Sequence, residues 1–205
     1  MKLAFFYCFP ACSNCYLLMT GEGKAAKSAM IIDPGDLDCA MIDCIESGGY
    51  FLEGALVTHD HAKHVHGLRA LRRIYPARTY ALNGSVEDEE TIQVKDGDKI
   101  SVGPFEVEVV AIPGHSPDSA AYKIGGMLFT GDALTAGLVG STASAYGAAT
   151  QAGALRSRLL SLPGDYVLFP GHGPPSTLEA ERCFNLGIAR QGESSRRKRA
   201  FRVIA

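Results

Sequence analysis

Residues 58–67 read THDHAKHVHG, and they are the most specific indication of the fold in the sequence. It directly follows an apolar, strand-like run at residues 52–58. Because side chains two residues apart in extended backbone point the same way, His59 and His61 can hold one ion together. His64 comes where the chain turns into a helix, which aims its ring toward an adjoining position. The stretch therefore predicts a metal site at the end of a strand.

Three further loops carry metal-binding side chains directly after strand-like runs. His115 lies in PGHSP at 113–117, Asp132 in TGDAL at 130–134 and His172 in PGHGP at 170–174. All six histidines of the chain fall in loops flanked by Gly or Pro, a concentration that is not expected of scattered structural histidines. Imidazole and carboxylate groups from four such loops predict an open site for a borderline metal such as zinc.

Strand-like and helical patterns alternate along most of the chain. Runs rich in β-branched and aromatic residues predict strands at 2–8, 15–19, 29–33, 52–58, 99–102, 105–112, 120–124, 127–130 and 166–169. Apolar residues at helical spacing predict helices at 37–46, 65–74, 149–162 and 177–190. This mixture indicates an α/β (α+β) layered fold rather than an all-β sandwich.

Together these motifs resemble the metallo-β-lactamase fold, a hydrolase superfamily with an HxHxDH signature. The resemblance runs from IIDPG at 31–35 to PGHGPPST at 170–177, and it is nearest to the glyoxalase II-like branch through Thr177, Glu181 and Asn185. It implies a four-layer αβ/βα sandwich with the site at the edge of two sheets. The ligands that it implies are His59, His61 and His115 for a first metal, and His64 and His172 for a second, with Asp132 bridging.

Lys63 occupies the position where the family pattern has Asp, a ligand of the second metal. Three interpretations are open: Lys63 pairs with Asp132 and supplies the charge of the second ion, it swings away and leaves a weak second site, or that site is lost. We favour the first, because a lysine–carboxylate pair at about 4 Å gains about 4 kcal/mol at an effective dielectric near 20, before desolvation. We therefore expect about one tightly bound zinc per chain, with iron as the alternative metal.

Three more residues near these motifs have expected supporting roles. Asp60 is expected to accept a hydrogen bond from a ring N–H of a ligand histidine. His66 is expected in a loop or on the substrate side, and replacement of the missing ligand is the alternative. Residues 135–147, rich in Gly, Ser and Ala and including Tyr146, are expected to form a mobile rim of the substrate pocket.

The chemistry expected of this site is attack by a metal-activated water on a carbonyl. Asp132 would orient the water, and Lys63 or a backbone N–H would stabilise the oxyanion. By resemblance the substrate is a small-molecule thioester or another activated ester. Two alternatives stand beside this one: a mono-iron persulfide dioxygenase on the same scaffold, and a non-catalytic relative that binds metal without turnover.

Composition and charge indicate a single domain and argue against nucleic-acid and membrane partners. The 205 residues suit one domain at 1–190, followed by a basic tail at 191–205 that is expected to be frayed. Residues 190–202 have a net charge of +5, whereas the whole chain has a net charge of −2. The rest of the chain is therefore acidic, and no nucleic-acid partner is expected. No apolar run is long enough to span a bilayer, so no membrane partner is expected either.

The cysteines and the first residues bear on the cellular compartment. The six cysteines, including the CxxC pair Cys12 and Cys15, are expected to be reduced thiols of a cytoplasmic protein, with a redox or metal role as the alternative. Residues 2–8 are expected to be a first strand rather than a short signal peptide. A homodimer is an open expectation.

Overall fold

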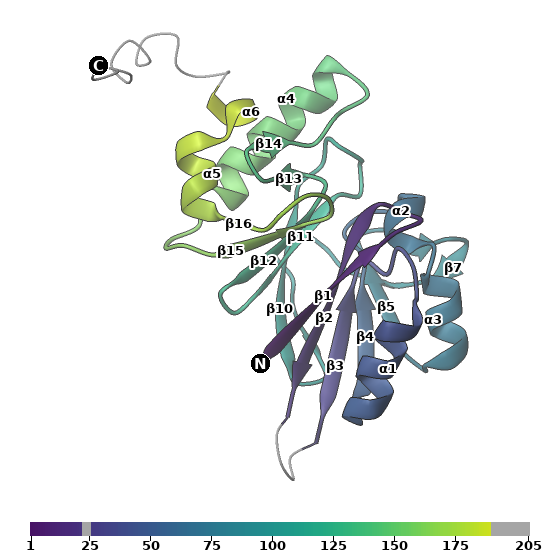
Figure 1. The fold of residues 1–205 in the computed structure, drawn as a ribbon. Helices are drawn as coiled ribbons and strands as arrows, with labels where there is room; N and C mark the ends of the chain where they lie inside the picture. Colours follow the sequence, from purple (N-terminus) through teal and green to yellow (C-terminus); the bar gives the residue numbers. More distant parts are fainter. Residues whose placement is uncertain (22–25, 190–205) are drawn as a thin grey trace.

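The computed structural model describes residues 1–21 and 26–189, and two six-stranded mixed sheets organise them (Figure 1). The first sheet has the order β1-β2-β3-β4-β5-β8, with β1 (Lys2–Cys8), β2 (Ser13–Thr20), β3 (Ser28–Ile32), β4 (Phe51–Leu56), β5 (Arg78–Ala81) and β8 (Ile92–Gln93). The second has the order β16-β15-β12-β11-β10-β9, with β9 (Lys99–Val102), β10 (Phe105–Ala111), β11 (Ala120–Ile124), β12 (Met127–Gly131), β15 (Val167–Pro170) and β16 (Ser176–Thr177). Two short hairpins pair β6 (Ser85–Val86) with β7 (Glu89–Glu90), and β13 (Leu134–Thr135) with β14 (Leu138–Val139).

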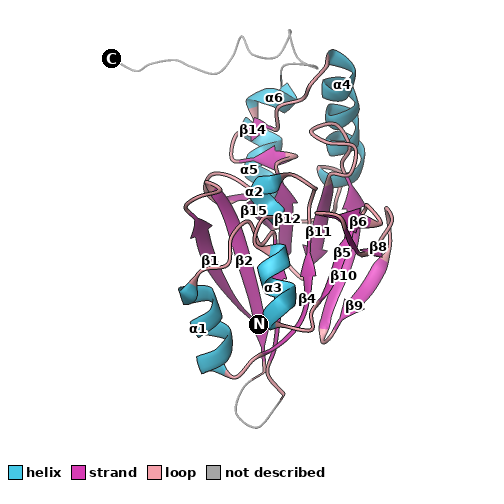
Figure 2. Cartoon of the chain, turned by 90° about the vertical axis from the view of Figure 1, so that its right-hand side faces the viewer, coloured by secondary structure: helices cyan, strands magenta, loops and turns pink. Residues whose placement is uncertain are grey.

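Helices cover the outer face of each sheet (Figures 1 and 2). The first sheet carries α1 (Cys39–Gly48) and α3 (Leu68–Ile74), and the short α2 (Ala62–Val65) precedes α3 in the chain. The second sheet carries α4 (Ala145–Ala154), which continues as the π-helical turn η1 (Leu155–Leu159), and α5 (Leu178–Phe184), followed by α6 (Leu186–Ala189). Asp38 begins α1 by accepting the backbone N–H of Met41 at 2.9 Å, which satisfies one of the free donors of the first turn.

Three apolar cores separate these layers. The core between the first sheet and its helices contains Met41, Ile45 and Leu71. The core between the two sheets contains Tyr16, Tyr122 and Phe129. The core between the second sheet and its helices contains Leu128, Leu155 and Leu159. Leu17 and Leu18 of β2 are both fully buried, because alternate side chains of a central strand enter different cores. The expected four-layer αβ/βα sandwich is confirmed.

The nine expected strands are present, but β5, β8, β16 and the two short hairpins are additional, and the expected helices differ in their bounds. The expected helix at 65–74 is two helices, α2 and α3, because the chain turns at Gly67, where a Cβ would come within 2.7 Å of the Pro34 carbonyl oxygen. The expected helix at 177–190 breaks at Asn185, whose backbone is extended. The expected helix at 149–162 corresponds to α4 and η1 and begins earlier, at Ala145, because the Ser144 hydroxyl accepts the Gly147 N–H and caps the helix.

The two halves of the sandwich are joined beside the loop that follows β15. The Asn14 side chain of β2 donates to the carbonyl oxygens of Pro170 at 2.9 Å and Gly173 at 2.8 Å, and the Tyr16 hydroxyl donates to Pro170 at 2.6 Å. The Asn14 backbone N–H donates to the Gly171 carbonyl at 2.8 Å. A strand of the first sheet therefore holds the loop that carries His172.

The remaining expectations concern the ends of the chain and the thiols. Residues 2–8 form β1, as expected, and all six cysteines are free thiols, with Cys12 exposed and Cys15 buried. None of the helices in the described ranges is long and apolar enough to cross a membrane. The expected basic tail at 191–205 lies outside the described residues.

Candidate metal centre

Five histidines and one aspartate meet where the carboxyl ends of several strands come together. His59 and His61 follow β4 and His64 lies in α2, whereas His115 follows β10, Asp132 follows β12 and His172 follows β15. Neighbouring imidazole centroids in this cluster are 4.3 to 5.2 Å apart. The structure thus brings together six of the side chains that the sequence motifs single out.

His59, His61 and His115 form the first group of the cluster. One ring nitrogen from each lies within 4.8 Å of the other two. The Nε2 atom of His115 is 3.1 Å from the Nδ1 atom of His61. Tetrahedral zinc at about 2.0–2.1 Å from each nitrogen would separate two ligand nitrogens by about 3.3 Å. The spacing therefore suits shared coordination of one ion.

Hydrogen bonds hold two of these rings in a defined tautomer. His115 Nδ1 lies 2.8 Å from the Ser141 carbonyl oxygen, which can only accept, so Nδ1 carries the proton. His59 Nδ1 lies 3.1 Å from the Thr58 hydroxyl, which itself donates to Asp33 at 2.7 Å and so accepts from the ring. Both Nε2 atoms are left with a free lone pair, the state that a metal ligand needs.

His64, His172 and Asp132 form the second group. His172 Nδ1 is 2.6 Å from Asp132 Oδ1, and His64 Nε2 is 3.5 Å from the same oxygen. The other oxygen, Asp132 Oδ2, is 3.7 Å from His115 Nε2 and 4.0 Å from His59 Nε2. The carboxylate of Asp132 therefore lies between the two groups.

Asp33 orients residues of both groups, and the sequence motifs do not assign it a role in the site. Its buried carboxylate accepts the Thr58 N–H and hydroxyl, each at 2.7 Å, and lies 3.1 Å from His64 Nδ1. Asp33 also adopts a positive φ of 51°, which Asp tolerates better than most residues. An acidic residue between an apolar strand and Pro-Gly is the sequence signal that points to it.

The two groups differ in the protonation that they favour. Burial, followed by the charge of His64, lowers the pKa of His59 to about 3, and burial together with His115 also lowers the pKa of His61. Burial alone would lower the pKa of His64, but the neighbouring carboxylates of Asp132 and Asp33 outweigh it and raise that pKa to about 10. Burial opposes ionisation of Asp132 as well, yet His172 and His64 hold its pKa well below the usual value.

Two glycines let the loops approach this closely. Gly131 has a φ of +50°, and a Cβ there would come within 2.3 Å of the Thr58 hydroxyl oxygen. A Cβ on Gly171 would come within 2.5 Å of both Asp132 Oδ1 and a ring carbon of His64. Any larger residue at either position would push the Asp132 or His172 loop out of the cluster.

The expected ion pair between Lys63 and Asp132 is not formed. Among the described residues, the ion-pair partners of Asp132 are His59, His64, His115 and His172. Consecutive helical residues are about 100° apart around the axis, so Lys63 points away when its neighbour His64 faces the carboxylate. The Lys63 side chain is exposed and lines a surface pocket beside α2.

The structure places Asp60 away from the ligand rings and His66 at the end of α2, beside a pocket. Asp60 is exposed and accepts no hydrogen bond from a ring within the described part of the chain; instead, its own N–H donates to Asp118 at 2.8 Å. Asp33 fulfils the orienting role expected of Asp60. His66 ends α2, is exposed and lines the same pocket as Lys63, so the structure places it outside the metal cluster and does not make it a replacement ligand.

A pocket of about 240 Å³ opens beside the cluster. His115, Asp132 and His172 form its base, and its wall comes from the β13–β14 hairpin and the residues after it: Thr135, Leu138, Val139, Gly140 and Ser141. Much of the expected rim at 135–147 therefore lines the pocket, as a hairpin rather than an irregular loop. Tyr146 lies in α4 with 82% of its surface exposed and is not among the lining residues.

The donor set fits a metal ion. The Nε2 atoms of His59, His64 and His172 are buried and have no hydrogen-bond partner among residues 1–21 and 26–189. Leaving such atoms unsatisfied costs about 1–3 kcal/mol each, and coordination to a cation would satisfy them. Imidazole nitrogens with one carboxylate suit zinc or iron better than magnesium or calcium.

Comparison with known proteins agrees with this geometry. Residues 13–172 match the family model described as the metallo-beta-lactamase superfamily, and this span includes the whole cluster. The chain belongs to the metallo-beta-lactamase superfamily. The resemblance to glyoxalase II-like proteins is also confirmed, because relatives of the chain include hydroxyacylglutathione hydrolases.

Relatives with two different activities have similar sequence identity to this chain. Human persulfide dioxygenase ETHE1 is 33% identical over 184 residues, covering 85% of this chain and 71% of that protein. The hydroxyacylglutathione hydrolase of Dechloromonas aromatica is 32% identical over 163 residues, covering 80% of this chain but only 59% of the hydrolase. The crystal structure of ETHE1 from Myxococcus xanthus superposes with a TM-score of 0.80 at 28% identity, covering 93% of this chain and 85% of that one.

Proposed function

We propose that this superfamily member is a hydrolase that uses one tightly bound metal ion to cleave a thioester or another activated ester. The observation that carries the proposal is the convergence of His59, His61 and His115 next to Asp132, with His115 and Asp132 also lining a pocket. Similarity to hydroxyacylglutathione hydrolases supports the choice of a thioester. A small-molecule substrate suits the pocket volume of about 240 Å³.

In this proposal, the first group holds the metal ion, and Asp132 accepts a proton from the attacking water. A zinc ion held by the first group would lower the pKa of a bound water and polarise the substrate carbonyl. Asp132 Oδ2 faces both His59 Nε2 and His115 Nε2, so it is placed to accept a hydrogen bond from the attacking water. His172 donates to Asp132 Oδ1 at 2.6 Å and fixes the orientation of the carboxylate.

Thiol release from a panel of thioesters by the zinc-loaded protein tests this proposal. Asp132→Asn should lower kcat/KM by at least about hundredfold, because the variant loses the charged acceptor for the proton of the water. Asp43→Asn, on the exposed side of α1, is the matched control and should leave turnover unchanged. Absence of thiol release with zinc, iron or manganese bound would contradict the proposal.

A mono-iron persulfide dioxygenase is the second candidate, and two observations favour it. His59, His115 and Asp132 form a two-histidine, one-carboxylate set, which is the ligand pattern of non-haem iron oxygenases. The chain also spans more of human ETHE1 than of the hydrolase, 71% against 59%. Oxygen uptake with glutathione persulfide by the iron-loaded protein, without thioester cleavage, would select this function. Metal binding without either activity would select a non-catalytic relative.

A further inference from the structure

A second pocket of about 240 Å³ lies beside α2, and we call it the α2 pocket. It is lined by Pro10 and Ala11 from the turn between β1 and β2, by Gly35 after β3, and by Ala62, Lys63 and His66 from α2 and its end. Apart from Lys63 and His66 these lining residues are apolar. The pocket therefore combines an apolar floor with two nitrogen bases on one wall.

None of the described residues that line the α2 pocket is acidic. Lys63 and His66 are three residues apart, so they lie on the same face of the helical turn. Both are exposed, and neither side chain makes a hydrogen bond or an ion pair with any residue in the described ranges. Asp60 is the acidic residue nearest to Lys63 in the sequence, and Asp36 adjoins the lining residue Gly35; neither lines the pocket, and Asp36 accepts the Leu37 N–H at 2.9 Å.

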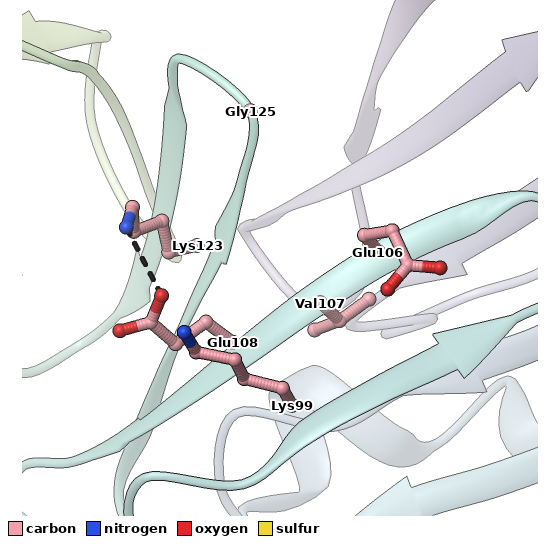
Figure 3. A pocket seen from close by; sticks show the side chains of 6 residues that line it. All are labelled: Lys99, Glu106, Val107, Glu108, Lys123 and Gly125. Carbon is pink, nitrogen blue, oxygen red and sulfur yellow. Dashed lines mark hydrogen bonds and ion pairs between the residues drawn. The ribbon is translucent and has the colours of Figure 1, made fainter.

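A pocket on the second sheet shows that this arrangement is not general. It has a similar volume, about 260 Å³, and is lined by Lys99, Lys123, Glu106 and Glu108, together with Val107 and Gly125 (Figure 3). Lys123 pairs with Glu108 at 3.0 Å, and the lining carries equal numbers of acidic and basic groups. The two pockets differ in charge balance rather than in size.

The α2 pocket also lies next to the metal centre. Lys63 directly precedes His64 and comes two residues after His61, and consecutive Cα atoms are about 3.8 Å apart. Two lining residues of the pocket, Ala62 and Lys63, therefore lie on the chain between the cluster histidines His61 and His64. The lysine that replaces a metal ligand in the family pattern faces this pocket instead of the ion.

We propose that the α2 pocket binds the carboxylate end of an anionic substrate whose reactive thioester lies at the metal centre. Lys63 and His66 would donate hydrogen bonds to the carboxylate, and Pro10 and Ala11 would contact the methylene groups between the carboxylate and the thioester. This inference rests on the proposed hydrolase function and names its substrate class: acyl thioesters that carry a carboxylate.

Binding of two matched thioethers to the metal-free protein tests the pocket directly. The probes are 5-(methylthio)pentanoate and its uncharged amide, and calorimetry or NMR titration measures the two dissociation constants. The carboxylate should bind about tenfold more tightly than the amide, because a charged acceptor gains more from Lys63 than a neutral one does. Omitting the metal prevents direct binding of the carboxylate to the ion.

Substitutions then assign this preference to Lys63. Lys63→Met should abolish the preference, Lys63→Arg should retain it, and Lys99→Met in the pocket of Figure 3 should leave it unchanged. Equal binding of the two probes by the unaltered chain, or an undiminished preference in Lys63→Met, overturns the proposal. Circular dichroism of each variant establishes that it has folded.

Thioester assays separate the pocket from the proposed function. The zinc-loaded protein is given methyl thioesters of succinate and of butyrate, and the succinate ester should show the higher kcat/KM. If neither is cleaved while the probe preference still depends on Lys63, the hydrolase function fails and the pocket stands. If both are cleaved equally and the probes bind equally, the pocket fails and the hydrolase function stands.

Discussion

The two ligand groups of the cluster share one pocket but differ in what they offer a metal. In the first group, the pKa values of His59 and His61 are lowered, so these imidazoles are neutral and ready to coordinate at neutral pH. In the second group, the neighbouring carboxylates of Asp132 and Asp33 raise the pKa of His64, and His172 is hydrogen-bonded to Asp132. The family pattern also has a carboxylate ligand where this chain has Lys63. On these grounds we expect one strong site beside a much weaker one.

Removing a ligand of the first group should have the largest effect. His115→Asn is expected to reduce bound metal from about one ion per chain to almost none and to lower turnover at least about thousandfold, because two nitrogens cannot hold zinc tightly. Elemental analysis of protein purified without added metal measures the first quantity. His66→Asn is the matched control, since His66 lies outside the cluster, and it should keep its metal. Retention of a full ion in His115→Asn would contradict the assignment of the first group.

Restoring the carboxylate of the second group should make the two groups more alike. Lys63→Asp is expected to raise the metal content from about one to about two ions per chain, because a carboxylate can ligate where an ammonium cannot. Lys63→Met, which removes the charge without adding a ligand, should remain at about one. Two tightly bound ions in the unaltered protein would show that the second group needs no carboxylate at position 63.

Removing Asp33 should weaken both groups through the rings that it orients. Asp33→Asn is expected to lower metal affinity about 10- to 100-fold, the usual effect of losing a residue that orients a ligand. Competition with a fluorescent zinc chelator measures this change. Asp60→Asn is the matched control, because Asp60 is exposed and bonds to no ring in the described part of the chain. An equal loss of affinity in the two variants would argue against an orienting role for Asp33.

The smallest expected effect is the pH dependence of the metal-free protein. His59 has a folded pKa of about 3, so the unfolded state takes up its proton first and stability falls as pH drops from about 6.5 to 3. His64 has a folded pKa of about 10, so its contribution is fully present below about pH 6.5 and is lost as pH rises to 10. The unfolding free energy should therefore peak near pH 6.5, with each group contributing a slope of at most about 1.4 kcal/mol per pH unit. Urea denaturation after chelation measures the curve.

A single substitution tests the origin of the alkaline side of that curve. His64→Gln should flatten the decline above pH 6.5, because glutamine has no proton to lose. The acid side should persist, since it arises from His59 and His61. A steep alkaline decline in this variant would assign the effect to a different group.

The meeting of the histidine loops could be predicted from sequence because each loop directly follows a strand, and strand ends gather at one edge of a layered sheet. The partners of the rings could not be predicted in this way. Asp33 reaches Thr58 and His64 only because its backbone takes a positive φ at the end of β3. Asp60 is nearer to the motif histidines in sequence, but its exposed position keeps it away from their rings.

The direction of Lys63 depends on the rotation of a single short helix. The HxHxDH pattern places residue 63 among the ligands, whereas the geometry of α2 turns His64 inward and Lys63 toward the surface. Electrostatic attraction to Asp132 favours the opposite arrangement, but the four histidine partners of Asp132 already satisfy it. Sequence reasoning on charge alone therefore predicts the wrong partner for this lysine.

The cluster takes its members equally from the two sheets, with His59, His61 and His64 on the first side and His115, Asp132 and His172 on the second. The chain passes between the two sheets through residues 94–98. A protein cut within that connection becomes a pair of fragments, each presenting half of a coordination sphere. Metal binding should favour reassembly of such fragments, in addition to the apolar core that the two sheets share, because an ion that binds only the complete sphere stabilises the assembled state.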